Sequence, residues 1–264
     1  EIAQRYGLSG FDVTPPPKAE EITLRKPRID VPAALQSLVR TDHLTRLEHS
    51  YGKAGFDATR MFMRSVPNPP DAVAFPGTEQ EVIEVLDWCD RIGAKAIPYG
   101  GGSSVVKGIE PAASFDKVVT ISMRHMDKVL EVDAVSHAAR IQGGIYGPAI
   151  EDALRDTPFT MRHYMQAYRC STLGGWIATR SGGHYATLYT HIDDFVESTR
   201  VVTPVGTVKS PQGSFTIGGN QSGPVTASLR SALVSIQRGD AADTLDDAGE
   251  HQQASARRKG KARG

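Results

Sequence analysis

The strongest chemical signal in the sequence is the stretch Pro98-Tyr99-Gly100-Gly101-Gly102-Ser103-Ser104-Val105-Val106. Three consecutive glycines leave backbone N–H groups unshielded and permit positive φ, so the chain can fold around an anion. The serine hydroxyls that follow add two more donors. Such a loop suits the pyrophosphate of a dinucleotide, and a merely flexible glycine turn is the alternative interpretation.

Two better-known phosphate loops do not fit this stretch. The pattern G-x-x-x-x-G-K-[ST] is absent, because Lys107 lies outside the required spacing. Gly100-x-Gly102-x-x-Val105 departs from G-x-G-x-x-G at its last position. The loop therefore belongs to neither of those two classes of nucleotide-binding loop.

A second glycine-rich stretch is Ser171-Thr172-Leu173-Gly174-Gly175-Trp176-Ile177-Ala178-Thr179. Ser171 or Thr172 can cap a helix, whose free N–H groups favour a phosphate or a carbonyl-rich ring. The two glycines would allow a flat ligand to approach closely, and a helix packed tightly on a neighbour is the alternative. Arg180-Ser181-Gly182-Gly183-His184 forms a further small-residue loop.

A predicted βαβ unit positions the first loop. Thr78 and Glu81 form a capping box for a helix that ends before Gly93. Predicted strands flank this helix, so the glycine loop follows a strand at its carboxyl end, where ligands bind in open α/β sheets. Further predicted elements are strands at 117–122, 128–133 and 138–142, helices at 41–51 and 148–154, and a hairpin at 201–208.

The two ends of the chain differ from its middle. Residues 1–40 are rich in proline, which predicts an extended arm lying on a domain. Residues 210–264 are rich in Gly, Ser, Ala, Gln and Asp and end in basic residues, so we expect this tail to be mostly disordered. A basic tail that binds nucleic acid or anionic lipid is the alternative.

Composition excludes several classes of protein. The net charge is +0, so no nucleic-acid partner is expected. No apolar run reaches the length of a membrane span. Cys89 and Cys170 are the only cysteines and lie in no C-x-x-C motif, which favours a reducing compartment and no metal site. We expect a cytoplasmic protein, with peripheral attachment to a membrane as an alternative.

Taken together, both glycine-rich stretches and His191-Ile192-Asp193-Asp194-Phe195-Val196 resemble the FAD-binding (PCMH-type) domain of the vanillyl-alcohol oxidase/p-cresol methylhydroxylase superfamily. Within it the resemblance is greatest to alkylglycerone-phosphate synthases and bacterial FAD-linked oxidases, from about Phe11 to Lys209. It implies an α+β fold with two α/β subdomains, at about 67–115 and 116–209, and FAD between them. Residues 1–66 would be an extended or helical N-terminal arm, and residues 210–264 a low-complexity tail that is disordered or out of frame.

The resemblance also implies a cofactor site. The first loop would hold the pyrophosphate, the second would line the isoalloxazine and ribityl chain, and a third segment would add backbone contacts. Arg169 departs from the acidic or aromatic pair of similar proteins, and a cation there would favour anionic flavin. The implied residues are Pro98, Tyr99, Gly100, Gly101, Gly102, Ser103, Ser104, Gln166, Ala167, Tyr168, Arg169, Cys170, Ser171, Thr172, Gly174, Gly175, Thr179, Arg180, Ser181 and Gly182.

The segment from Arg180 to His184 is similar to the loop that attaches FAD covalently to histidine in berberine-bridge-type relatives. That motif occupies the first loop in those proteins and follows the second loop here, so we expect non-covalent FAD. The closing Glu-Gly-Thr-Leu-Gly-type turn and the cap domain of the family are not found. We therefore expect a truncated or frame-shifted chain with an unpaired edge in its second sheet, no assignable catalytic residue and little activity.

Three functions follow from the resemblance. The first is the exchange of acyl for alkyl on acyl-dihydroxyacetone phosphate in ether-lipid synthesis. The second is FAD-linked oxidation of 2-hydroxy acids, and the third is a non-catalytic FAD-binding remnant. The substrate would be lipid-type or a 2-hydroxy acid, and a homodimer is an expected assembly.

Overall fold

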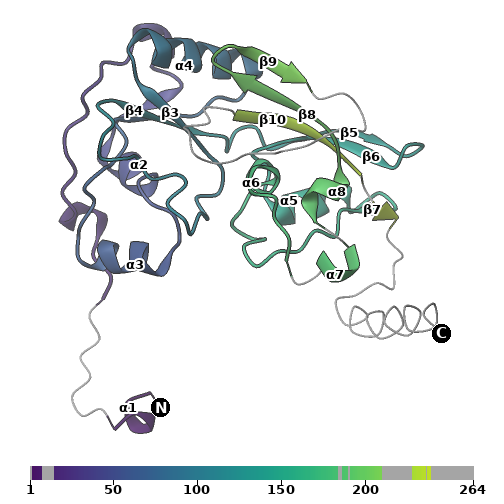
Figure 1. The fold of residues 1–264 in the computed structure, drawn as a ribbon, viewed down its shortest axis with the longest axis horizontal. Helices are drawn as coiled ribbons and strands as arrows, with labels where there is room; N and C mark the ends of the chain where they lie inside the picture. Colours follow the sequence, from purple (N-terminus) through teal and green to yellow (C-terminus); the bar gives the residue numbers. More distant parts are fainter. Residues whose placement is uncertain are drawn as a thin grey trace.

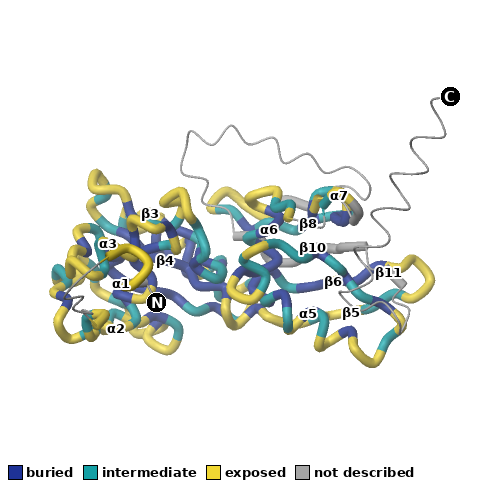
Figure 2. The backbone as a smooth tube through the Cα atoms, turned by 90° about the horizontal axis from the view of Figure 1, so that it is seen from below, coloured by how far each residue is buried: buried dark blue, intermediate teal, exposed yellow. Residues whose placement is uncertain are grey.

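The computed structural model describes residues 2–7, 15–183, 186–189, 191–209, 228–235 and 237–238. It has an α+β fold with two units, each a sheet covered by helices (Figure 1). Buried backbone concentrates inside each unit and where the two units meet (Figure 2). The mixed fold with two units agrees with the sequence-based prediction.

The first sheet has the strand order β1-β2-β4-β3, from Val39–Arg40, Ala72–Ala74, Val118–Ser122 and Lys95–Tyr99. Strands β2, β4 and β3 are parallel, and β1 pairs antiparallel with β2. Since β4 lies between β2 and β3, the first unit extends beyond the boundary expected at 115/116. The sequence did not reveal this placement of β4, because strand order depends on pairing between distant segments, which periodicity does not encode.

Helix α4 (Glu79–Arg91) covers one face of this sheet and begins at the predicted capping box. The N–H of Glu81 donates to Thr78 Oγ1 over 3.2 Å, and the N–H of Thr78 donates to Glu81 Oε2 over 3.1 Å. Gly93 follows the helix at φ +67°, as the expected left-handed end requires. Helix α4 buries a row of apolar side chains against the strands, namely Val82, Val85, Leu86, Trp88 and Cys89.

The N-terminal arm contributes more structure than the predicted extended segment. It contains helix α1 (Ile2–Arg5), the 3-10 turns η1 (Ala19–Glu21) and η2 (Ala33–Leu35), and strand β1. Helices α2 (His43–Glu48) and α3 (Gly55–Phe62) follow, and only α2 was predicted. Buried Asp71 fastens the arm to the sheet by accepting hydrogen bonds from Arg25 and Arg28 and from the N–H of Val118.

The second sheet has the strand order β5-β6-β10-β8-β9, from Val129–Asp133, Ala138–Gln142, Ser228–Ser235, Val196–Thr203 and Gly206–Lys209. Helices α5 (Gly147–Leu154), α6 (Leu173–Thr179) and α8 (Ile192–Phe195) lie below it in Figure 1. Helix α7 (Ala186–Tyr189) and the short pair β7 (Phe159–Thr160) and β11 (Gln237–Arg238) complete this unit. Its core includes Ile141, Leu154, Leu173, Trp176, Ile177 and Ile192.

Strand β10 lies within the tail that was expected to be mostly disordered. Ser228–Ser235 pairs antiparallel with both β6 and β8, so it fills the middle of the sheet, and the expected unpaired edge is not found there. The run Ala232-Leu233-Val234 is locally apolar within a polar segment. The average composition of residues 210–264 concealed this run. The backbone groups of β6 and β8 supply the hydrogen-bond partners of β10. Residues 210–227 and 239–264 lie outside the described residues.

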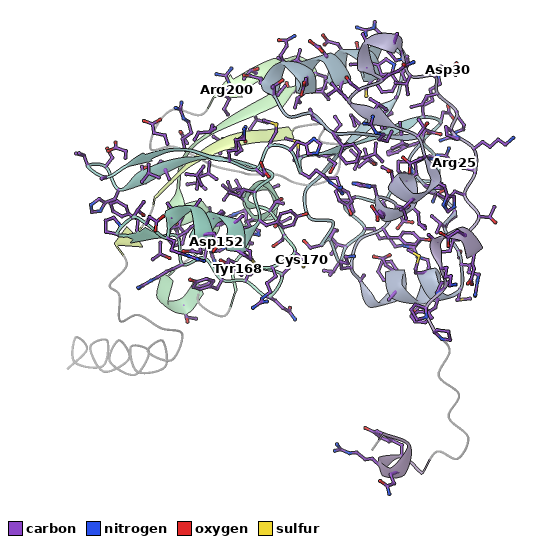
Figure 3. The ribbon with its side chains drawn as sticks, turned by 180° about the vertical axis from the view of Figure 1, so that it is seen from behind. Arg25, Asp30, Asp152, Tyr168, Cys170 and Arg200 are labelled. Carbon is purple, nitrogen blue, oxygen red and sulfur yellow. The ribbon has the colours of Figure 1, made fainter. Side chains whose placement is uncertain are left out.

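The two units interlock through β8. Val202 of β8 is 1% exposed and packs in the core of the first unit, beneath α4. Arg200, whose place on the outer face is labelled in Figure 3, donates to Glu79 Oε1 through Nη2 over 2.6 Å. One strand of the second sheet thus fixes the first unit relative to the second.

Candidate functional site at the junction of two glycine-rich loops

The glycine triplet leaves β3 at the carboxyl edge of the first sheet. Within it Gly102 adopts φ +67°, and Gly100 and Gly101 do not have positive φ. A Cβ on Gly101 would lie 2.0 Å from the carbonyl oxygen of Cys170. Positive φ, which the sequence permits at all three glycines, is thus found in the triplet at Gly102 alone. Gly101 is required by the close approach of another backbone, and Gly102 by its backbone conformation.

The two predicted cofactor loops meet at this point. A Cβ on Gly100 would lie 2.2 Å from Thr172 Oγ1, so the absence of side chains lets the loops touch. Thr172 is 2% exposed, and its Oγ1 makes no hydrogen bond within the described chain. A buried hydroxyl without a partner is costly unless a ligand or water completes it. These features fit a polar ligand such as a dinucleotide at the junction.

Two of the predicted serine contacts are occupied by the protein itself. Ser104 Oγ accepts from the N–H of Gly108 over 3.0 Å. Ser171 Oγ donates to the carbonyl of Ala167 over 2.7 Å and accepts from Nε1 of Trp176 over 2.6 Å. These hydroxyls shape their loops, while Ser103 is partly exposed.

The backbone N–H groups at the amino end of α6 make hydrogen bonds that the sequence does not predict. The N–H of Leu173 donates to Ile145 O over 3.0 Å, and the N–H of Gly174 donates to Gly143 O over 2.8 Å. A Cβ on Gly174 would lie 2.8 Å from that same Gly143 oxygen. The prediction of free N–H groups is thus wrong for these two residues, because the helix packs tightly on a neighbouring turn.

The segment from Gln166 to Cys170 lies at the side of the second unit that faces the first. Figure 3 labels Tyr168 and Cys170 on this side. Gln166, Arg169 and Cys170 are exposed, and Ala167 is partly buried. The ring of Tyr168 stacks on Trp176 with centroids 6.3 Å apart, and burial raises the Tyr168 pKa. This segment therefore presents one aromatic wall and several accessible groups.

The third predicted segment, from Thr179 to Gly182, is held by contacts inside the second unit. Thr179 Oγ1 donates to Gly175 O over 2.8 Å, and Arg180 forms an ion pair with Asp193 at 2.6 Å. Ser181 Oγ lies 2.8 Å from Nε2 of His163. Gly182 packs beside the ring of His191, and His184, the residue considered for covalent attachment, lies outside the described residues.

Two buried titratable groups near the junction stay neutral. Burial raises the pKa of Tyr99 to about 12, and its hydroxyl donates to the carbonyl of Glu48 over 3.1 Å. Burial lowers the pKa of His163 to about 4, with the charge of His191 as a smaller cause. Near neutral pH the Tyr99 hydroxyl therefore keeps its proton and the His163 ring carries no charge.

Sequence reasoning missed Arg124, which is separated from the end of β4 by Met123 alone and lies at the same carboxyl edge of the first sheet. Its exposed guanidinium lies over the ring of Phe75, 4.9 Å from the centroid. The available signal was its place after a predicted strand, next to the strand that carries the glycine loop.

A groove of about 510 Å³ lies elsewhere, along β5 and α5 of the second unit. None of the predicted cofactor residues lines it; its lining residues are Asp127, Lys128, Val129, Leu130, Glu131, Val132, Ile145, Ala149 and Ala153. Within the described ranges no cluster of His, Cys, Asp and Glu could hold a metal ion. No helix among the described residues is long and apolar enough to cross a membrane.

Comparison with known proteins gives a consistent result. The profile of a family described as "FAD binding domain" matches residues 70–210. The chain is 35% identical over 207 residues to an alkyldihydroxyacetonephosphate synthase of Dictyostelium discoideum, covering 78% of this chain and 33% of that protein. It is 31% identical over 160 residues to a D-2-hydroxyglutarate dehydrogenase of Xanthomonas citri, covering 61% of this chain and 32% of that protein.

A solved structure of an alkyldihydroxyacetonephosphate synthase superposes with a TM-score of 0.80 at 32% identity. The superposition covers 88% of this chain and 45% of that structure. The chain thus spans about a third to a half of the length of these relatives. The family match at residues 70–210 includes both glycine-rich loops.

Proposed function

Because this chain belongs to the FAD binding domain family, its cofactor is FAD, and we propose that the dinucleotide lies where the glycine loop meets the Ser171–Thr172 loop. The observation that carries this proposal is the direct approach of Gly100 and Gly101 to Cys170 and Thr172. Two segments that are far apart in the sequence come together at this point. Each is rich in glycine, although glycine favours neither helices nor strands. The close packing of the loops explains the missing side chains at Gly100 and Gly101, and a ligand bound where the loops meet would contact both loops.

The proposed roles follow from the chemistry of each group. Backbone N–H groups of the glycine loop bind the pyrophosphate, and the unpartnered Thr172 hydroxyl supplies a hydrogen bond from the second loop. The segment from Gln166 to Cys170 lines the isoalloxazine ring, with Tyr168 as an aromatic wall. When bound, FAD supplies a ring that accepts electrons or binds substrate, while the residues named here orient it and exclude water.

We propose that the chemistry is that of an alkyldihydroxyacetonephosphate synthase, in which an alkyl group replaces the acyl group of acyl-dihydroxyacetone phosphate. The support is the identity of 35% to one such synthase and the TM-score of 0.80 to another. Oxidation of a 2-hydroxy acid is the second candidate, which the identity of 31% to a D-2-hydroxyglutarate dehydrogenase favours. A non-catalytic FAD-binding protein is the third.

Two assays separate these candidates. The purified chain is incubated with FAD and passed through a desalting column, and retained flavin absorbance reports binding. The loaded protein is then tested for alkyl exchange on acyl-dihydroxyacetone phosphate and for dye reduction with D-2-hydroxyglutarate. Exchange without dye reduction supports the first candidate, the reverse supports the second, and flavin retention without either reaction supports the third. Failure to retain FAD would contradict all three.

The bound FAD is proposed to be non-covalent. Acid precipitation of the loaded protein should release the flavin into the supernatant. Flavin that remains with the denatured pellet would contradict this and would point to a covalent bond, with His184 as the first residue to replace.

A further inference from the structure

Arg124 lies close to the strand that carries the glycine loop. It follows β4 on the segment that connects the two units, at the carboxyl end of the parallel strands. Ser122, the last residue of β4, pairs with Tyr99, and the N–H of Met123 donates to Tyr99 O over 2.9 Å. Because the glycine loop starts immediately after Tyr99, the backbone around Arg124 is fixed directly to the root of that loop.

Two neutral groups hold the guanidinium. Its Cζ lies 4.9 Å from the centroid of Phe75, and its Nη2 lies 3.5 Å from Nε2 of His49. His49 is 1% exposed, and its Nδ1 lies 2.8 Å from the carbonyl oxygen of Thr45. A carbonyl can only accept, so Nδ1 carries the proton and Nε2 presents a lone pair to Arg124. Burial, with the charge of Arg124 as a smaller cause, lowers the His49 pKa and keeps the ring neutral.

No carboxylate in the part of the chain that the structure describes neutralises this cation. Among the described residues no acidic side chain lies within 4.0 Å of the Arg124 nitrogens, whereas Arg25, Arg60 and Arg200 each form an ion pair with a carboxylate. An arginine that is oriented by neutral partners keeps its charge and most of its donors for an external anion. A guanidinium matches the oxygen geometry of a phosphate through paired N–H donors.

We propose that Arg124 binds a phosphate group of the FAD dinucleotide and thereby adds a charged side chain to a site otherwise built from backbone and hydroxyl groups. This inference rests on the proposed function, since it needs the dinucleotide at the loop junction. Arg124 is a binding residue in this account and takes no part in the reaction.

The test measures FAD affinity of the full chain by quenching of flavin fluorescence. The variants are Arg124→Gln, Arg124→Lys and the control Arg91→Gln; Arg91 is exposed at the end of α4, near the start of β3, on the opposite edge of the sheet. We expect Arg124→Gln to weaken FAD binding about tenfold at low salt, the effect of one charge-assisted hydrogen bond. Arg124→Lys should keep part of the affinity, and Arg91→Gln should change nothing.

Salt and a second ligand distinguish binding from a structural role. The difference in FAD affinity between wild type and Arg124→Gln should shrink at high salt. ADP carries the same pyrophosphate as FAD, so it should compete with FAD about tenfold less well on the variant than on wild type. Equal affinities of wild type and Arg124→Gln would overturn the proposal. A loss that is independent of salt and accompanied by a lower Tm would overturn it too, because it would mean that Arg124 only supports Phe75. A wild-type chain that binds neither FAD nor ADP would instead contradict the proposed function.

Discussion

At the scale of single residues, the glycine triplet separates two reasons for glycine. Gly102 needs a left-handed backbone, and Gly101 needs the space taken by Cys170. The sequence predicted the loop and its anion-binding character, because three glycines in a row are visible without a structure. It could not predict which glycine serves which purpose, because the partner at Gly101 comes from a distant segment.

Gly101→Val should abolish FAD retention. The added side chain would begin 2.0 Å from the Cys170 carbonyl and force the two loops apart. We expect FAD affinity to fall by at least about a hundredfold, since several contacts of one ligand are displaced together. The measurement is a fluorescence titration with FAD. Gly55→Ala, whose Cβ would meet nothing within 4 Å, is the matched control, and a Gly101→Val chain that binds FAD like the control would show that the loop was misassigned.

Asp71 should give the protein an acid-sensitive component of stability. Burial acts to raise its pKa, but hydrogen bonds from Arg28 and Arg25 and from the Val118 N–H outweigh burial and lower it from 3.8 to about 2. Because the folded-state pKa lies below the unfolded value, this stability is present above about pH 4 and is lost as the pH falls toward 2. Urea unfolding at several pH values should show a decline in this window.

Asp71→Asn should remove most of that decline. The variant should also be less stable at pH 7 by on the order of 3 kcal/mol, because two arginines lose their carboxylate. An Asp71→Asn protein that is as stable as wild type at neutral pH would mean that the arm is held by other contacts.

At the scale of elements, local signals predicted local structure. The capping box at Thr78, the left-handed Gly93 and the hairpin near Val205 follow from neighbouring residues, and the structure confirms them. Sheet membership was not predictable in the same way. β4 joins the first sheet, β1 comes from the arm and β10 from the tail, and each placement depends on partners distant in the chain.

Strand β10 offers a test at this scale. Leu233 pairs with Arg140 of β6 and with Ser198 of β8, so Leu233→Pro should remove a ladder bond in the centre of the sheet. We expect faster hydrogen exchange in residues 138–142 and a loss of about 3 kcal/mol in unfolding free energy. Unchanged exchange in β6 would mean that residues 228–235 are not part of the sheet in solution.

At the scale of the whole molecule, the two units meet at the site that we propose for FAD. Val202 under α4 and the Arg200–Glu79 ion pair fix their relative position on one side, and the two glycine-rich loops meet on the other. The sequence predicted both loops and two units. It did not predict how closely the loops approach, since the residues that Gly100 and Gly101 contact come from a distant segment of the chain.

Hydrogen–deuterium exchange of the full chain with and without FAD tests the central claim most directly. If FAD lies at the junction, residues 100–104 and 166–172 should become protected together, while the β5–α5 groove around Leu130 stays unchanged. Protection of both loops is the predicted result. Protection of the groove instead, or of neither loop at FAD concentrations that saturate the protein, would contradict the account.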